Sequence, residues 1–163
     1  MRRFGRINSL FLFALLLTAC EGTSFQSSVP AYPVHIEIDT RTIVSFTPEN
    51  MGSYIIVGRN YYYLDGKPIQ PTTVKDACGY GGILVYIGMN GYEAYDLACP
   101  FCAAKGKNRP CHIDGSKAVC DECGEEYSLG MGIAVPTKGI CKEPMRSMQV
   151  LNSYPVIIIK QRQ

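Results

Sequence analysis

Four cysteines, arranged as two Cys-x-x-Cys pairs, are the side chains of this sequence best suited to chemistry. Cys99 and Cys102 form the first pair, Cys120 and Cys123 form the second, and seventeen residues separate the pairs. Two residues between cysteines allow a tight turn that directs both sulfur atoms the same way. Four thiolates at one point suit zinc, a single iron or an iron–sulfur cluster. The spacing therefore predicts one metal site and leaves the identity of the metal open.

Disulfide bonds are an alternative use of the same four cysteines. The N-terminal sequence indicates export, and oxidising compartments favour disulfides. A redox-active pair of the thioredoxin type is not expected, because that pair opens a helix within a βαβ unit and the sequence has no such pattern. We favour a metal or cluster, and the spacing alone leaves both uses open.

The remaining cysteines surround these pairs. Once Cys20 and the two pairs are set aside, Cys78, Cys111 and Cys141 remain, so at most one disulfide can form among them. His112 follows Cys111, and a lone histidine at the start of a strand is more often structural than a ligand. Cys111, His112 and Cys141 are therefore candidate neighbours of the site and not members of the predicted ligand set.

No set of residues indicates catalysis. The sequence has no nucleophile elbow with an ordered Ser-His-Asp set, and neither of its two histidines, His35 and His112, lies in a zinc-protease motif. We predict no independent catalysis. A role as the electron-transfer component of an oxidoreductase system stays open.

The N-terminus has the order of an export signal. Met1–Arg6 is basic, and Leu10–Leu17 is an apolar run that is shorter than the roughly 20 residues of a membrane-spanning helix. Leu-Thr-Ala-Cys, ending at Cys20, resembles the lipobox of bacterial lipoproteins, in which the cysteine is lipidated and becomes the first mature residue. The alternative is an ordinary signal peptide with a chance cysteine. We expect a lipoprotein signal over residues 1–19 and a Ser/Pro-rich tether over 20–33.

Composition narrows the class of protein further. A length of 163 residues suits one domain, and 47% hydrophobic residues with 18% charged residues excludes a disordered chain. The formal net charge of +2 gives no reason to expect nucleic acid as a partner.

Short β-rich runs separated by turn signals fill the rest of the chain. Val34–Asp39 alternates apolar and polar residues, as a half-buried strand does. Further strands are expected at Ile43–Phe46, Tyr54–Val57, Tyr61–Leu64, Ile83–Ile87, Tyr92–Ala98 and Val156–Ile159, with turns at Asp65-Gly66, Asn90-Gly91 and Asp114-Gly115. No stretch sustains a helical period over three turns. The pattern predicts an all-β, antiparallel domain over residues 34–163.

Residues 98–150 resemble the cluster-binding half of a Rieske domain. Rieske proteins carry a first loop of Cys-x-His type and a second of Cys-x-x-His-Gly type, then an aromatic residue, a glycine-rich turn, a covering loop with proline and a strand. Here Cys120–Tyr127 reads Cys-Asp-Glu-Cys-Gly-Glu-Glu-Tyr, and Gly130–Ile133 supplies the turn. Pro136–Pro144 resembles the covering loop, and Met145–Leu151 the closing strand.

Both histidine ligands of that family are absent from this chain. Phe101 and Cys123 occupy the histidine positions, whereas Cys99 and Cys120 match the cysteine ligands. Cys123 is a chemically sound substitute, and Cys102 lies one residue beyond the first lost histidine. The resemblance therefore implies a four-cysteine centre, whose potential would fall toward the roughly −400 mV of four-cysteine ferredoxins.

The resemblance also implies a fold and a function. The fold would be an antiparallel Rieske-like β-sandwich with a two-loop, zinc-ribbon-like subdomain at about residues 98–145. The centre would be a 2Fe–2S cluster, a single iron or zinc, and the protein would transfer electrons to a partner protein. It would be anchored by palmitate-type acyl chains to a membrane of the bacterial cell envelope, on the periplasmic side or at the cell surface. The alternative is a non-catalytic binding or structural lipoprotein whose pairs hold a structural zinc or form disulfides.

Overall fold

The computed structural model describes residues 27–43, 45–59, 61–69 and 74–162. The described chain forms short antiparallel strands and one helical turn, which confirms the predicted all-β class. The elements are β1 (Val34–Asp39), β2 (Tyr54–Gly58), β3 (Tyr61–Leu64), β4 (Lys67–Pro68), β5 (Val74–Cys78), β6 (Ile83–Gly88), β7 (Gly91–Asp96), α2 (Pro100–Ala103), β8 (His112–Asp114), β9 (Lys117–Val119), β10 (Glu126–Ser128), β11 (Val135–Lys138), β12 (Gln149–Ser153) and β13 (Val156–Lys160).

The predicted signal, Cys20 and the first part of the tether lie outside the described residues. Within the described ranges, none of the helices has the length and apolar character needed to cross a membrane.

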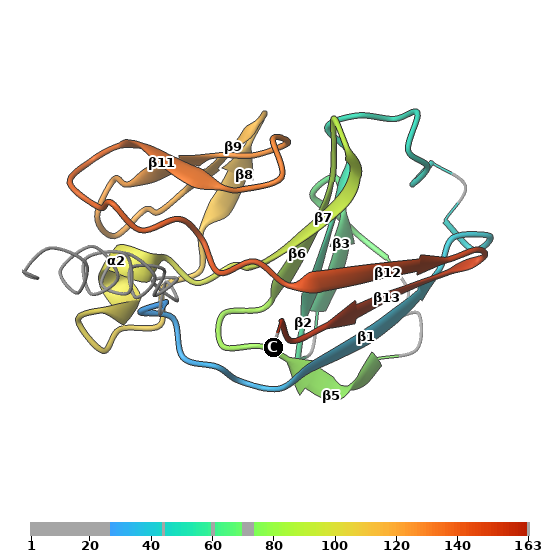
Figure 1. Ribbon diagram of the computed structural model, residues 1–163, viewed down its shortest axis with the longest axis horizontal. Coiled ribbons are helices and arrows are strands. Elements are labelled where there is room, and N and C mark those ends of the chain that lie inside the picture. The colour runs from blue at the N-terminus through green and yellow to red at the C-terminus, as the bar shows by residue number, and fades with distance from the viewer. Residues whose placement is uncertain (1–26, 44, 60, 70–73, 163) are drawn as a thin grey trace, which may run out of the picture.

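Two sheets face each other to form a sandwich (Figure 1). One sheet has the strand order β4-β3-β2-β6-β7, and the other has the order β12-β13-β1-β5. Alternate residues of β1 are buried, and Ile36 and Ile38 pair with Ile159 and Ile157 of β13. This alternation puts isoleucines on the inner face because successive side chains of a strand point to opposite faces.

Strand β6 is buried along its whole length because it borders two cores. Ile83, Val85 and Ile87 pack into the core of the sandwich, which also contains the inner isoleucines of β1 and β13. Leu84 and Tyr86 point the other way, into a second core that contains the cysteine pairs. The unbroken apolar run of β6 therefore joins the sandwich to the cysteine-rich end of the molecule.

A third sheet lies beside the sandwich, at the left of Figure 1. Its strand order is β11-β10-β9-β8, and α2 lies near it. The chain enters this region after β7 and returns to β7 before β12. At this neck the Asp96 amide donates to the Arg146 carbonyl, and the Met148 amide donates to the Ala94 carbonyl, both at 2.8 Å. The sandwich with a two-loop subdomain at one end is the architecture that the sequence predicted.

The predicted hairpins at the DG and NG turns are present. In the β3–β4 hairpin, Asp65 and Gly66 both have positive φ angles, 46° and 76°. This is the conformation of a type I′ turn, which Asp-Gly favours. The β6–β7 hairpin closes with Gly91 at φ 91°.

Two predicted strands differ from the structure. The segment at Ile43–Phe46 was expected as a strand, but its described residues form turns in which the Phe46 amide donates to the Ile43 carbonyl. Ile43 and Phe46 are nevertheless buried in the sandwich core, so their apolar character reflects burial of a turn. The closing strand expected from Met145 begins only at Gln149, because residues 146–148 form the neck against β7.

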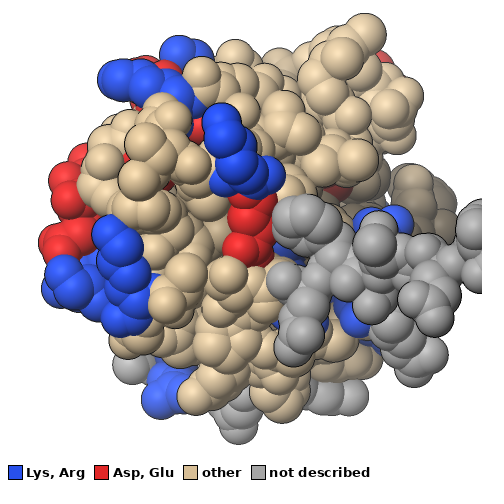
Figure 2. All heavy atoms as spheres, turned by 60° about the vertical axis from the view of Figure 1, so that its left-hand side comes forward, with Lys and Arg blue, Asp and Glu red and all other residues tan. Residues whose placement is uncertain are grey.

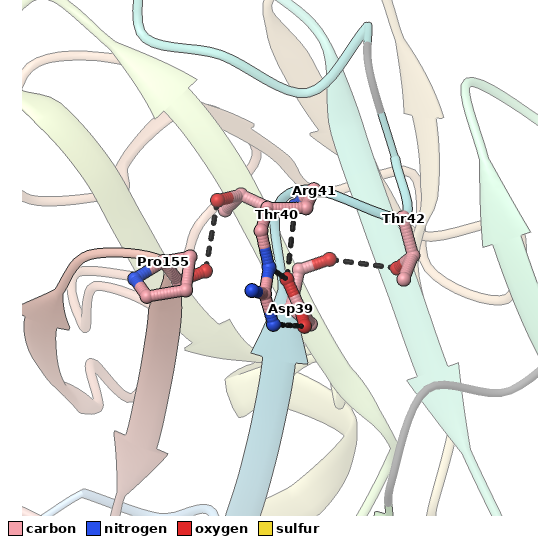
Figure 3. A network of polar contacts seen from close by, with 5 residues as sticks. All are labelled: Asp39, Thr40, Arg41, Thr42 and Pro155. Atoms are coloured by element: carbon pink, nitrogen blue, oxygen red, sulfur yellow. Dashed lines mark hydrogen bonds and ion pairs between the residues drawn. The ribbon is translucent and has the colours of Figure 1, made fainter.

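The end of β1 is fastened to the β12–β13 turn by a small polar network (Figure 3). The Asp39 carboxylate accepts hydrogen bonds from the Arg41 amide and guanidinium, and the pKa of Asp39 is lowered by this guanidinium. The Thr42 hydroxyl donates to the Asp39 carbonyl at 2.7 Å. Thr40 donates through its amide and its hydroxyl to the Pro155 carbonyl. These contacts fix the end of the sandwich that lies away from the cysteine pairs.

Candidate metal centre

The first cysteine pair lies at the start of a short helix. Cys99 precedes α2 as its N-cap residue, and Pro100 occupies the first helical position, where proline is favoured. The Cys99 amide donates to the Arg109 carbonyl at 2.9 Å, which holds the start of the turn. The tight turn expected between the two cysteines is therefore one turn of helix at the first pair. Nothing in the strand pattern of Tyr92–Ala98 signalled this one-turn helix, although Pro100 was the available clue.

The second cysteine pair forms a knuckle after β9. The Gly124 amide donates to the Cys120 carbonyl at 2.8 Å, and the Cys120 amide donates to the Glu125 carbonyl at 3.0 Å. Gly124 has a φ angle of 73°, which a residue with a side chain rarely adopts. Gly124 therefore supplies the positive φ angle that the turn after Cys123 requires.

The two pairs meet sulfur to sulfur. The Sγ atoms of Cys99 and Cys123 lie 3.6 Å apart, those of Cys102 and Cys120 lie 3.8 Å apart, and all four lie within 4.8 Å of one another. Four sulfur atoms placed 2.3 Å from a zinc ion at the corners of a tetrahedron are about 3.8 Å apart. A disulfide needs about 2.05 Å between its sulfur atoms. The sulfur arrangement therefore matches one tetrahedral metal ion.

The same distances disfavour a two-iron cluster. In a 2Fe–2S centre, two cysteines bind each iron, and the iron–sulfide core separates the two ligand pairs. The ligand pairs must then lie farther apart than two sulfur atoms bound to one metal. In this chain no such separation exists, since each sulfur is within 4.8 Å of the other three. The sulfur distances therefore favour a single ion over the 2Fe–2S cluster that the resemblance implied.

The centre is largely shielded from solvent. Cys99, Cys102 and Cys120 are buried, and Cys123 is half-buried. Leu84, Tyr95 and Tyr127 belong to the apolar core around them. Such a shell excludes water from the thiolates and leaves one edge of the site, at Cys123, near the surface.

Neighbouring donors lower the pKa of the Cys99 thiol. A hydrogen bond from Cys111 lowers the pKa of Cys99 to about 4, against the opposing effect of burial, and Tyr127 and Cys123 add to the lowering. The same hydrogen bond and burial raise the pKa of Cys111. Burial raises the pKa of Cys102 to about 11. The surroundings therefore prepare a thiolate at Cys99, and thiolates are the form that binds metal.

The candidate neighbours separate into two kinds. Cys111 is 2% exposed and lies against Cys99, and half-buried Cys141 lies on the covering loop near Tyr127. His112 faces the surface, where its Nδ1 atom lies 3.0 Å from the Asp121 carboxylate. Cys111 and Cys141 are thus neighbours of the centre, and His112 is directed away from it. Cys78 lies in β5, within the sandwich.

The covering loop is held by a buried acid that the sequence reading did not single out. The Glu125 carboxylate is 2% exposed and accepts hydrogen bonds from the amides of Ile140 and Cys141, the shortest at 2.7 Å. Gly139 has a φ angle of 104°, and a Cβ atom there would collide with this carboxylate. The available signal was the placement of Glu125 directly after the knuckle glycine.

Two further buried acids hold loops in the same way. Glu93 accepts from the Tyr95 hydroxyl and from the amides of Gly130 and Gly132. Asp96 accepts from the amides of Tyr80, Gly81 and Ala98 at 2.7 to 2.9 Å, and burial raises its pKa despite these bonds. Each carboxylate is therefore occupied by loop amides, and none forms a pair suited to acid–base catalysis.

The surface around the centre carries charges of both signs. In Figure 2, lysine and arginine side chains lie next to aspartate and glutamate in small groups, and uncharged surface separates one group from the next. Lys107 and Arg109 pair with Glu122, next to Cys123, and Lys117 and Lys138 pair with Glu126. No strongly basic face is visible in this view.

Comparisons with known proteins yield a structural match only. No protein-family model matches the chain, and no curated protein matches it. Among solved structures, a chain of the "Complex of reduced oxygenase and oxidized ferredoxin in carbazole 1,9a-dioxygenase" is similar at 13% sequence identity with a TM-score of 0.44. The match covers 82% of this chain and 98% of that chain.

Proposed function

We propose that Cys99, Cys102, Cys120 and Cys123 bind one metal ion in tetrahedral thiolate coordination, and that this ion holds the two loops of the small subdomain together. The sulfur distances carry the proposal, because they match a single tetrahedral ion and exceed a disulfide bond. Four thiolates leave no open coordination position for a substrate, so the centre is structural and not catalytic.

Zinc is the ion we propose for this role. Thiolates are soft ligands that select zinc, Cu(I) or iron, and a four-sulfur tetrahedron is typical of zinc or iron. The third sheet has strands of three or four residues, and its pairing alone offers little stability. Metal binding energy is folding energy in such small units. A zinc ion would therefore supply stability that the strands of this subdomain lack.

Electron transfer by a single iron at the same four cysteines is the second candidate. An iron ion there would supply one-electron chemistry. Half-buried Cys123 supports this candidate because it brings one ligand close to the surface. The hydrogen bond between the Tyr127 hydroxyl and Cys99 also supports it, since hydrogen bonds to ligand sulfur tune reduction potentials.

The proposed setting is a lipid-anchored protein of the bacterial cell envelope. The lipobox-like sequence ending at Cys20 supports it, together with the basic and apolar segments that precede that cysteine. Changing Cys20 to Ala should release the protein from membranes or block its maturation. Unchanged membrane fractionation and acyl labelling of that variant would contradict the anchor.

Metal and sulfide analysis of protein purified without oxygen tests the centre. One zinc per chain and no acid-labile sulfide is the expected result. One iron per chain would favour the electron-transfer candidate, and two irons with two sulfides would contradict a single-ion site. Protein without metal and without titratable thiols in denaturant would show the pairs to be disulfides.

A pair of matched variants links the metal to its ligands. Cys99→Ser should lose the metal, because a hydroxyl is a far weaker ligand than a thiolate for soft ions. Cys111→Ser makes the same chemical change at a buried neighbour and should keep the metal. Retention of the metal by Cys99→Ser, at the level found in Cys111→Ser, would remove Cys99 from the ligand set.

A further inference from the structure

A cleft of about 410 Å³, with Cys78 in its lining, lies outside the candidate metal centre and is within the size range of small-molecule sites. It opens between the β2–β3 turn and the glycine-rich segment before β6. Its walls include three tyrosine rings, one arginine and one asparagine, which are Tyr32, Tyr61, Tyr80, Arg59 and Asn108. None of these side chains takes part in the candidate metal centre.

The floor of the cleft is fixed in place. Asp96 accepts the amides of Tyr80 and Gly81, and the Asn108 side-chain amide donates to the Tyr80 carbonyl at 2.7 Å. The Tyr61 ring lies so close to Gly58 that a Cβ atom there would collide with it. The cleft is therefore lined by backbone that hydrogen bonds fix in place and by the Tyr61 ring, which packs against Gly58.

The polar groups of the cleft have unused capacity. Within the described part of the chain, no ion pair or hydrogen bond engages the Arg59 guanidinium. The hydroxyls of Tyr32, Tyr61 and Tyr80 likewise have no hydrogen-bond partner among the described residues. A guanidinium binds a carboxylate through two parallel hydrogen bonds. The site thus offers one anion-binding group beside several hydroxyls.

The tyrosine rings favour a puckered ligand over a flat one. Tyr32 and Tyr80 have ring centroids 5.3 Å apart and planes tilted by 45°, so they form no parallel slot for an aromatic ring. Tyr32 is 50% and Tyr61 38% exposed, which leaves ring surface free for contact with a ligand. The C–H face of a sugar ring packs against a single aromatic face, and its hydroxyls bond with the surrounding polar groups.

From these features we propose that the cleft binds an acidic sugar unit, with the carboxylate of a uronate on Arg59 and the sugar ring against a tyrosine. This site goes beyond the proposed metal centre and does not depend on it. The ligand class follows from one unpaired cation, tilted half-exposed rings and a polar rim.

Calorimetric titration of the full-length protein tests the proposal with three probes: trigalacturonate, neutral maltotriose and benzoate. Trigalacturonate should bind, and maltotriose and benzoate should bind at least tenfold more weakly. Absence of trigalacturonate binding would overturn the proposal. Equal binding of maltotriose would remove the role of the carboxylate, and tighter binding of benzoate would replace the sugar by a flat aromatic acid; either result overturns it.

Matched variants locate the site. Arg59→Gln should weaken trigalacturonate binding by about tenfold or more, as loss of a charge-assisted hydrogen-bonded pair does. Arg41→Gln removes the same charge at the far end of the sandwich and should leave binding unchanged. Tyr32→Ala should weaken binding while Tyr32→Phe keeps most of it. Unchanged metal content and melting temperature would show that Arg59→Gln is folded, and full binding by that folded variant would overturn the assignment.

Discussion

The Tyr127 hydroxyl lies 3.5 Å from the Sγ atom of Cys99, within hydrogen-bonding range of sulfur. Tyr127 is fully buried in β10, which follows the second cysteine pair, whereas Cys99 belongs to the first. Burial and this hydrogen bond raise the pKa of Tyr127, so the phenol stays protonated and acts as a donor. A residue that follows the second cysteine pair therefore hydrogen-bonds to a ligand sulfur of the first pair.

Changing Tyr127 to Phe should alter the metal centre without emptying it. The ring remains, but Cys99 loses a hydrogen bond and becomes a stronger electron donor, so the sulfur-to-metal charge-transfer band of cobalt-substituted protein should shift. Loss of the bond should also cost about 1 kcal/mol of stability. Tyr95→Phe is the control, since its hydroxyl bonds to Glu93, and it should leave the band in place. Identical spectra for both variants would show that Tyr127 does not act on the ligand.

Removing the metal should loosen one part of the molecule and spare the other. A chelator with a thiol reductant should speed amide hydrogen exchange in residues 99–103 and 117–141, because the bound ion joins these loops. Amides of β1, β6 and β13 should stay protected, since their pairing depends on the separate sandwich core. Loss of protection throughout the chain would indicate that the two cores unfold together.

Changing Gly139 to Ala should destabilise the protein by more than the usual cost of a left-handed residue. The strain of a positive φ costs roughly 1–2 kcal/mol, and the new methyl group would also strike the buried Glu125 carboxylate. Gly106→Ala isolates the first effect, because Gly106 has a φ angle of 72° and open space around its Cβ position. Denaturant unfolding should show the larger loss for Gly139→Ala. Equal losses would mean that the covering loop can move off Glu125.

The effect of Glu126→Gln on stability should depend on pH. Hydrogen bonds from Lys117 and then Lys138, at 2.8 and 2.6 Å, lower the pKa of Glu126 from 4.5 to about 2. A lowered pKa stabilises the folded state above the unfolded pKa, and this contribution is lost as the pH falls toward the folded value. The difference in unfolding free energy between wild type and Glu126→Gln should therefore be full at pH 7 and shrink between about pH 4.5 and 2. A difference that stays constant with pH would contradict this role.

Much of the fold could be predicted from local sequence. The alternation in Val34–Asp39 was sufficient to predict strand β1, and Asp65-Gly66 was sufficient to predict the β3–β4 hairpin. Both signals work because strand period and turn chemistry are local properties. Ile43 and Phe46 misled the prediction because burial by distant strands makes a turn as apolar as a strand. The two cores on either side of β6 also depend on tertiary packing, which an unbroken apolar run does not reveal.

The four cysteines of the candidate site could be predicted from their spacing, and the arrangement around them could not. Which sulfurs lie closest depends on the helix at Pro100 and the knuckle at Gly124, and only the second left a clear signal. The hydrogen bond from Tyr127 to Cys99, and those that Glu125 accepts from the covering loop, join residues that are distant in sequence and meet only in the folded chain. Contacts of this kind follow from packing, and the sequence signals them only through the placement of Glu125 directly after the knuckle glycine.

The neck between Asp96 and Arg146 separates sequence variation in the metal-binding subdomain from the strands of the sandwich. The subdomain leaves the sandwich and returns to it at adjacent backbone positions of the same strand, which are already joined by hydrogen bonds. A change in the length or composition of the intervening loops need not shift the strands on either side of the junction. Natural selection or protein engineering can therefore replace the metal-binding insert while the strands of the sandwich keep their register.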